Sequence, residues 1–321
     1  MHVNRGLLFW GLALITAGAT ALAVQQGYVQ RETVAEAWRL WPVILIAIGL
    51  SIVLSRTPFS VIGTIVAALV LGVAGGALVT VGPGIACTGD IPADSDTSTG
   101  EFTGGDAATV DLTFNCGELA VGMAAGRAWT AETAVAGSRE VELSADGASL
   151  LLQSSEEGGF DINGGRQRWD IGLGSDLTYD MNVSANAADV DLALSGGRFS
   201  QLTIDPNAAS LLIDLSGTSV EAFRMAMNAG SADIVTDAAT VLGGTLNMNA
   251  GSVKLCTPPD AALRFIVSAN VTFSHNLDDR GLTESGDTWT SNGFAGAATA
   301  IDLRLEGNAA SFTLNPDGGC S

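Results

Sequence analysis

The sequence holds few of the side chains on which most enzyme sites depend. Its 321 residues include two histidines, His2 and His275, and two tyrosines, Tyr28 and Tyr179. Its four cysteines form no CxxC pair, and their spacing fits no zinc motif. A catalytic triad needs a base, and His275 is the only histidine outside the N-terminus. We therefore expect a protein that is not an enzyme, with no catalytic residue, no cofactor and no metal.

Basic residues are scarce beyond residue 87. The segment 88–321 holds 32 of the 34 acidic residues but only 10 of the 14 basic ones, a net charge of −22. A surface this acidic repels nucleic acid and anionic lipid headgroups. It also helps a β-rich domain to stay soluble. We expect no nucleic-acid partner.

Long apolar runs are confined to residues 1–86, which we predict to be a transmembrane module. The segments at about 6–24, 38–54 and 59–81 each approach the roughly 20 residues that cross a bilayer as a helix. Trp10, Trp38 and Trp41 lie at or near segment ends, where indole rings favour the headgroup region. The expected fold of this part is an α-helical bundle of three spans, with the lipid bilayer as its partner.

The basic residues between these segments do not decide the orientation. With the N-terminus inside, Arg5 and Arg56 are cytoplasmic while Arg31 and Arg39 lie outside, which is a tie. No Lys or Arg occurs between Arg56 and Arg127, so nothing after the third segment resists translocation. Three spans then place the acidic, cysteine-bearing domain outside.

Two alternatives stay open for the membrane module. The first segment could instead be a signal peptide cleaved near Ala21-Leu22-Ala23, which would leave two spans and the same location of the C-terminal domain. Gly72 and Gly76 form a GxxxG pair in the third segment. This pair favours close packing of helices within one chain, and a homo-oligomer is the alternative.

The strongest signal is an internal repeat of 21 residues in the C-terminal part. Turn sequences of the type Asn-Ala-Ala-Asp and Asn-Ala-Gly-Ser recur at this interval, and apolar residues alternate with polar ones on both sides. Such alternation is typical of strands with one buried face. A single unit cannot bury its apolar side, but stacked units can. The asparagines that mark the repeat are Asn186, Asn207, Asn228, Asn249 and Asn270.

These observations predict an all-β, single-stranded β-helix or solenoid with rungs of about 21 residues. Asparagine suits the turn because it tolerates φ > 0 and bonds its own backbone. Stacked asparagines can also hydrogen-bond from rung to rung, as amide ladders do. We interpret the five asparagines as a structural turn ladder. A ligand-binding row of asparagines is the alternative.

The repeat also sets the predicted domain organisation. Diverged copies of the repeat at 110–121, 141–152 and 303–314 extend the solenoid over residues 107–321, with an irregular excursion at 271–297. The polar stretch 87–106 is expected to be a tether between the transmembrane module, 1–86, and the solenoid.

The cysteines, Cys87, Cys116, Cys256 and Cys320, all lie after the predicted spans. An even number there suggests two disulfides and an oxidising compartment, with four separate thiols as the alternative. Cys256 lies at an outward position of its rung, which suits a bridge to the tail at Cys320. Cys87 and Cys116 would then join the tether to the first rung. Four cysteines allow three pairings, and the sequence does not choose among them.

Two segments resemble known families. Residues 5–54, with RGLLFWGLALITAG followed by WRLWPVILIAIGL, resemble the transmembrane region of LiaI and LiaF-type proteins. The stretch GTLNMNAGSVKLCTPPDAALRFIV and the closing IDLRLEGNAASFTLN resemble the toastrack, or adhesin-like, solenoid that often accompanies it. The family varies in helix count, and its solenoid can lie on either side of the membrane.

The resemblance implies a bacterial membrane protein that senses or modulates cell-envelope stress through membrane signalling partners, without catalysis. We expect a multi-pass protein with an extracytoplasmic solenoid that acts by protein–protein interaction. A surface adhesin or structural spacer is the alternative. A polysaccharide-active enzyme is a third, supported by fold analogy alone.

Overall fold

The computed structural model describes residues 11–12, 14–16, 68–69, 90–136, 140–155, 165–269, 272–295 and 297–320. The chain divides into two compact units, Met1–Thr88 and Gly89–Ser321. In the first unit the few described residues are helical, and the rest of the predicted spans lies outside the described residues. None of the helices within the described ranges has both the length and the apolar character needed to cross a bilayer.

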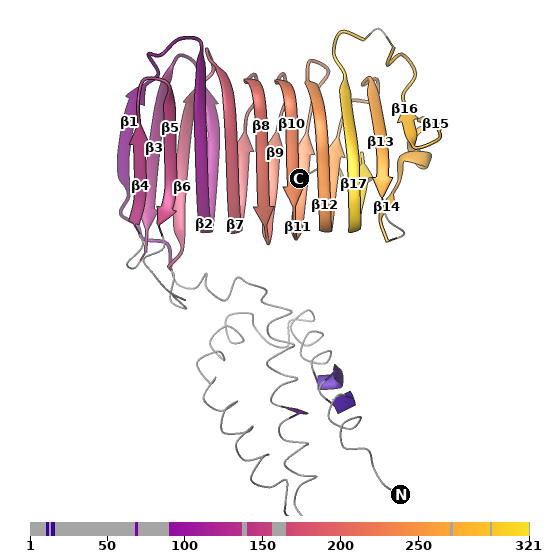
Figure 1. The fold of residues 1–321 in the computed structure, drawn as a ribbon, viewed down its shortest axis with the longest axis horizontal. Helices are drawn as coiled ribbons and strands as arrows, with labels where there is room; N and C mark the ends of the chain where they lie inside the picture. The colour runs from indigo at the N-terminus through magenta and orange to yellow at the C-terminus, as the bar shows by residue number, and fades with distance from the viewer. Residues whose placement is uncertain are drawn as a thin grey trace, which may run out of the picture. The chain divides into compact units, whose positions relative to one another are not determined.

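The second unit is a β-solenoid, which confirms the predicted all-β architecture (Figure 1). Four long strands bend at the asparagine turn and run through both faces: β2 (Ala107–Ala124), β7 (Thr178–Ala193), β12 (Val241–Cys256) and β17 (Ile301–Leu314). Two rungs are divided at that turn, into β8 (Arg198–Asn207) with β9 (Ala209–Asp214), and β10 (Ser219–Met227) with β11 (Gly230–Val235). Neighbouring copies pair in parallel at the predicted interval, as Asn186 with Asn207 and Ala209 with Gly230 show.

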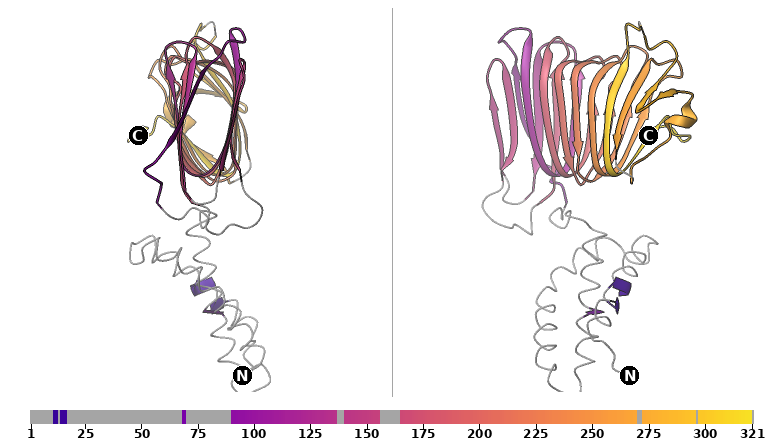
Figure 2. Two further views of the ribbon diagram at one scale, coloured as in Figure 1. Left: turned by 90° about the vertical axis from the view of Figure 1, so that its left-hand side faces the viewer. Right: turned by 45° about the vertical axis from the view of Figure 1, so that its right-hand side comes forward.

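The two faces lie opposite each other when the stack is viewed along its length (Figure 2). Face A contains the first halves of the long strands together with β8 and β10, and face B contains their second halves together with β9 and β11. The inward side chains of both faces form one apolar core. Leu192, Ile213, Ile234 and Leu255, six residues after the turn asparagines, are fully buried. Each such side chain contributes about 1.5–3 kcal/mol by leaving water.

The N-terminal end of the solenoid does not follow the repeat. Residues 141–152, expected to form a rung, instead form a hairpin of β4 (Glu140–Ala145) and β5 (Ser149–Ser155), which pair antiparallel. The Asp146 carboxylate makes the tight turn by accepting hydrogen bonds from the backbone N–H groups of Ala148 and Ser149, at 2.8 and 2.7 Å. This turn reverses the chain, whereas a rung would continue it to the other face.

The predicted tether also contains structure. Residues 96–101, inside the stretch 87–106, form β1 (Asp96–Glu101), which pairs antiparallel with β3 (Ala128–Val135). β3 in turn pairs antiparallel with β6 (Gln167–Gly174), and β6 pairs with the second half of β2. The alternation of Asp, Thr, Ser and Gly in β1 buries little apolar surface, which is why the sequence pattern did not indicate a strand.

At the C-terminal end the last strand is not the outermost one. β17 lies between β12 and β13 (Leu263–Ala269), and Figure 1 shows it as a yellow strand among orange ones. The irregular excursion supplies β14 (Ser274–His275), the 3-10 helix η3 (Leu277–Arg280), and the hairpin of β15 (Thr283–Ser285) and β16 (Thr288–Thr290). The diverged copy at 303–314 is therefore not the end of the stack, because the rung of β13 and β14 lies beyond it.

On face B, the edge of β17 is covered first by β14, at Ser311 and Phe312, and then by a side chain at Leu314. The Asn276 side-chain amide donates to Leu314 O at 3.0 Å, and its carbonyl accepts from Leu314 N at 2.8 Å. This amide imitates the backbone of one more strand residue. It satisfies groups that an open edge would offer to another chain.

Candidate functional site

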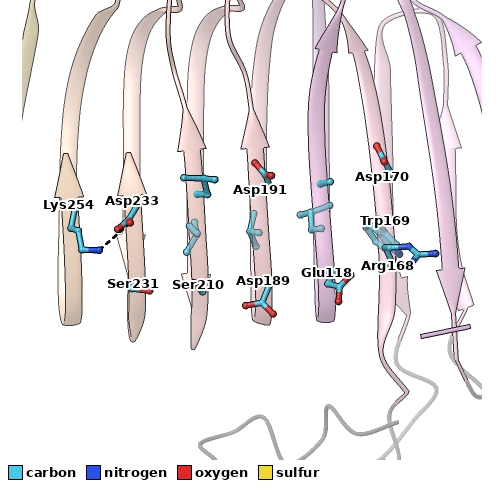
Figure 3. A pocket seen from close by; sticks show the side chains of 15 residues that line it. Glu118, Arg168, Trp169, Asp170, Asp189, Asp191, Ser210, Ser231, Asp233 and Lys254 are labelled. Atoms are coloured by element: carbon cyan, nitrogen blue, oxygen red, sulfur yellow. Dashed lines mark hydrogen bonds and ion pairs between the residues drawn. The ribbon is translucent and has the colours of Figure 1, made fainter. Parts of the chain in front are cut away.

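A shallow groove of about 450 Å³ crosses the strands of face B (Figure 3). Outward side chains from six adjacent strands line it, because every second residue of a strand points away from the core. The strands follow one another as β6, β2, β7, β9, β11 and β12. The groove thus brings together residues that are far apart in the sequence.

Backbone register fixes the order of charges in the groove. Glu118 pairs with Arg168 on one side and with Asp189 on the other, so these three form one row. The row continues as Ser210 and Ser231. Neighbouring strands lie about 4.8 Å apart, so this row offers one polar group at each such step.

A second row lies two residues further along the strands. It contains Asp170, Asp191 and Asp233 on alternate strands, about 10 Å apart given the interstrand spacing. Lys254 follows on β12, and its ammonium lies 3.2 Å from the Asp233 carboxylate. Only 14% of the Asp233 side chain is exposed, so this ion pair is partly shielded from water.

The groove is therefore strongly acidic. It contains five carboxylates against two cationic side chains. A second ion pair, between Arg166 and Glu118 at 3.1 Å, lies at its rim. Asp189 and Asp191 are exposed. Such a surface suits a positively charged partner, since complementary charge raises association rates and selects partners.

The titratable side chains of the groove are carboxylates, one lysine and one arginine, and its lining includes no histidine, cysteine or tyrosine. Within the part of the chain that the structure describes, no three His, Cys, Asp or Glu side chains are grouped so that they could hold a metal ion. The arrangement favours binding.

Apart from Asn270, the predicted asparagines lie at the turn where the two faces meet, and Asn186, Asn207 and Asn228 each come three residues before a residue of the groove's first row. The Asn186 amide donates to Asn115 Oδ1 at 2.7 Å, and the Asn249 amide donates to Asn228 Oδ1 at 2.9 Å. The Asn308 amide continues the row by donating to Asn249 Oδ1 at 2.9 Å. Asn207 pairs with Asn186 through the backbone register. Asn270 lies outside the described residues.

We expected asparagine at these turns because it tolerates a positive φ, but these asparagines are not the residues that adopt one. The positive φ angles occur at the residues after them: Ala187 has φ 49° and Ala208 has φ 54°. Where the turn reads Asn-Ala-Gly, the glycine takes that conformation, with φ 132° at Gly230 and 120° at Gly251. Asparagine is thus present for its side-chain amide, and the following small residue provides the left-handed turn.

Aspartates stabilise the second turn of the central rungs. Asp237 Oδ1 accepts from the backbone N–H of Gly217 at 2.8 Å and of Ala239 at 2.9 Å. The bond from Gly217, with smaller contributions from Ala239 and Thr240, lowers the pKa of Asp237 below its usual range. Asp214 is similar: burial raises its pKa, but hydrogen bonds from Ser216 and Ser195 outweigh burial, and the net shift is downward.

One disulfide joins Cys256 to Cys320, with their Cα atoms 5.9 Å apart, and confirms that the protein uses disulfides. It fastens the C-terminal tail back to the end of β12. Cys116 is also disulfide-bonded. Cys87 lies outside the described residues, so the pairing expected for it stays a prediction.

His275, which is not among the groove residues, lies in an aromatic cluster. Its ring meets the Trp289 ring edge-on, with centroids 4.9 Å apart, and the tilted Phe273 ring has its centroid 6.2 Å away. Trp289 Nε1 donates to Asp278 Oδ1 at 3.0 Å. The half-buried His275 therefore packs against aromatic rings of the irregular excursion.

Sequence reasoning missed the groove as a site. The repeat does place Asp191, Asp233 and Lys254 at outward positions of equivalent strands. It does not show that β2 lies between β6 and β7, and β2 and β6 supply Glu118 and Arg168. A repeat template with inward and outward positions marked could have revealed only the part of the groove between β7 and β12.

Comparison with known families supports both resemblances. Residues 8–53 match the LiaI-LiaF-like transmembrane region, and residues 89–237 match the N-terminal domain of toast_rack, DUF2154. Neither description names a catalytic activity. The first match indicates a membrane anchor. No curated protein matches this chain.

Two solved structures are similar over the solenoid. One is a "putative cell adhesion protein" from Clostridium sporogenes ATCC 15579, with 13% identity and a TM-score of 0.47, covering 69% of this chain and 98% of the other. The second is a "putative adhesin" from Bacteroides fragilis NCTC 9343, with 8% identity and a TM-score of 0.26, covering 70% of this chain and 98% of the other.

Proposed function

We propose that this chain, which carries a LiaI-LiaF-like transmembrane region followed by a toast_rack domain, is a non-enzymatic, multi-pass bacterial envelope protein that senses or modulates cell-envelope stress. In this proposal the solenoid lies outside the cytoplasm. It acts by binding a membrane signalling partner through the acidic groove of face B. The combination of this anchor with a groove that holds an excess of carboxylates is the observation that carries the proposal.

Charge favours a partner with a basic surface segment. The groove has an excess of carboxylates, and the solenoid around it carries a net charge of −22 over residues 88–321. Its regular row of carboxylates and serines offers repeated contacts at the interstrand spacing rather than one deep pocket. Binding of this kind is fast and sensitive to salt, which suits a reversible regulatory contact.

The test compares groove and control variants in cells. A strain without the protein is complemented with the wild type, with Asp189→Lys/Asp191→Lys in the groove, or with Asp205→Lys/Glu142→Lys on face A. All four positions are exposed, and the two variants make the same change in net charge. The transcriptional response to a cell-wall-active antibiotic should be restored by the wild type and the face A variant but not by the groove variant.

Location is measured in the same strains. A membrane-impermeant maleimide should label the cysteines of intact cells only after reduction. Labelling that requires lysis but no reductant would place the solenoid in the cytosol. An unchanged antibiotic response in the strain without the protein would sink the signalling role.

The alternative is a surface adhesin or spacer. The two solved structures have adhesion-related descriptions, but their similarity concerns the fold and does not transfer a ligand. Loss of attachment to cells or surfaces, with a normal antibiotic response, would favour this alternative.

A further inference from the structure

Face A carries an irregularity that is repeated in two adjacent rungs. The pairing of β7 with β8 shifts by one residue between Tyr179 and Asp180, and that of β10 with β12 shifts between Val220 and Phe223. β8 and β10 stay in register with each other. Each therefore contains one extra residue at the same height, a stacked β-bulge. Bulges occur preferentially beside functional sites.

Two glycines of β12 lie directly against this bulge. A Cβ on Gly244 would lie 1.9 Å from Phe223 O, so only glycine permits this close approach. A Cβ on Gly243 would meet nothing nearer than Glu221 O, at 3.7 Å. Above them lies an open hollow of about 610 Å³, whose floor at these glycines is bare backbone.

The rim of this hollow is polar and carries both signs of charge. Glu221 and Arg224 come from β10, and Glu306 comes from β17. Thr245 and Asn247 add a hydroxyl and an amide from β12. Among the ion pairs formed by described residues, none involves Glu221, Arg224 or Glu306. Hydrogen-bond donors and acceptors thus surround the glycine floor, and the charged side chains among them form no ion pair with one another.

We propose that this hollow binds a polysaccharide built from N-acetylated amino sugars. A pyranose ring is flat enough to lie on the glycine backbone, and its hydroxyl and acetamido groups can bond the carboxylates, guanidinium and amide of the rim. A linear glycan laid across the rungs meets a new strand about every 4.8 Å, so that successive sugars contact successive rungs.

Other ligand classes fit less well. A polyanionic glycan would be repelled by the net charge of −22 on residues 88–321. A protein segment usually binds through buried aromatic or aliphatic anchors, and the rim offers no apolar pocket for them. The hollow also lacks the aromatic platform that strengthens many sugar sites, so a single site binds weakly and affinity grows with the length of the glycan.

The experiment uses the full-length protein in detergent micelles and saturation-transfer NMR, which detects weak binding. The probe is chitotetraose, with tetragalacturonate as an anionic comparison and tetra-alanine as a peptide comparison. Saturation transfer is expected to chitotetraose and not to the other two. Gly243→Phe fills the hollow above a position that tolerates a Cβ, and should weaken binding at least tenfold.

Gly122→Phe is the matched control. Gly122 is an outward glycine of β2 on face B, and a Cβ there also meets open space. This variant should bind chitotetraose like the wild type. The proposal is overturned if the wild type shows no transfer to chitotetraose, if Gly243→Phe binds as well as Gly122→Phe, or if either comparison ligand binds better. The hollow lies on face A, so failure here would leave the groove proposal untouched.

Discussion

Between β7 and β12 each rung pairs with the next copy along the chain, whereas the strands near the two ends pair over long distances. The asparagines of the central rungs are 21 residues apart, but Asn186 meets Asn115 across 71 residues and Asn308 meets Asn249 across 59. The central rungs thus assemble from local contacts. The ends are closed by strands inserted from elsewhere in the sequence, which makes them more dependent on the complete chain.

The largest expected effect comes from removing the inserted strand. Deleting residues 301–321 removes β17, with the fully buried Leu303, Leu305 and Phe312. It also separates β12 from β13. Since each lost core side chain costs about 2–5 kcal/mol, we expect β13–β16 to lose their structure while the central rungs keep theirs. Hydrogen exchange of the full chain and the deletion would show this.

A shorter deletion is the control. Removing residues 316–321 leaves β17 in place and takes away only the tail and its disulfide. Retained protection of β13 in the longer deletion would contradict the view that the ends depend on the insertion.

The disulfide should have the next largest effect. Cys256 and Cys320 are 64 residues apart, and closing a loop of this size stabilises a fold by about 3–4 kcal/mol. Cys256→Ser/Cys320→Ser should lower Tm and speed exchange in the tail and the end of β12. Equal Tm values for this variant and the wild type under oxidising conditions would show that the tail adds nothing to the C-terminal end.

The asparagine ladder allows a direct comparison between two neighbouring positions. Asn249→Ala removes two amide bonds, to Asn228 and from Asn308, whereas Asn228→Ala removes the one from Asn249. At about 0.5–1.5 kcal/mol for each bond, Asn249→Ala should destabilise the protein more. Urea unfolding midpoints would measure both. The reverse order would mean that stability does not follow the number of amide bonds in the ladder.

The smallest effect concerns the second turn of the central rungs. The lowered pKa of Asp237 means that its stabilisation is present above the unfolded pKa, about 4, and is lost as pH falls through the lower folded value. Asp237→Asn should therefore cost less than about 1 kcal/mol at pH 7, because the residue is only partly buried and water screens its charge. The difference in Tm from the wild type should shrink towards pH 3.

Comparison of the two proteins at each pH is essential here. Protonation of many carboxylates also relieves repulsion within the acidic solenoid, in both proteins alike. A Tm difference that stays constant from pH 7 to pH 3 would contradict a role for the ionised Asp237.

The central rungs could be predicted from the sequence, whereas the strand order at the two ends could not. The 21-residue spacing located the turns, and the alternating residues around them identified the buried positions of the central rungs. It could not indicate that β2 lies between β7 and the pair of β5 and β6. Which strand edges pair with each other depends on the total apolar area that each possible strand order buries. The spacing of the repeat carries no information about this area.

The candidate sites were less accessible to sequence reasoning. Glu221 and Ala222 are two consecutive exposed residues, which breaks the alternation of buried and exposed residues and is a sign of a β-bulge. The same break occurs at Ser200 and Gln201, one repeat earlier. Because the break recurs at the repeat interval, it looked like part of the regular pattern. The groove of face B requires the positions of Glu118 and Arg168, and these follow from strand order. The net charge and the repeat together predict an acidic scaffold, but they do not indicate where its binding surface lies.

The insertion of β17 has a consequence for how the protein is made. Chains are synthesised from the N-terminus, so β13 leaves the ribosome before β17, the strand that must lie between it and β12. The rungs up to β12 can stack as they appear, but their open edge can be covered in the native order only after the final residues have been added. A chain that stops early retains an uncovered edge, a mark by which proteases and chaperones could distinguish unfinished copies from complete ones.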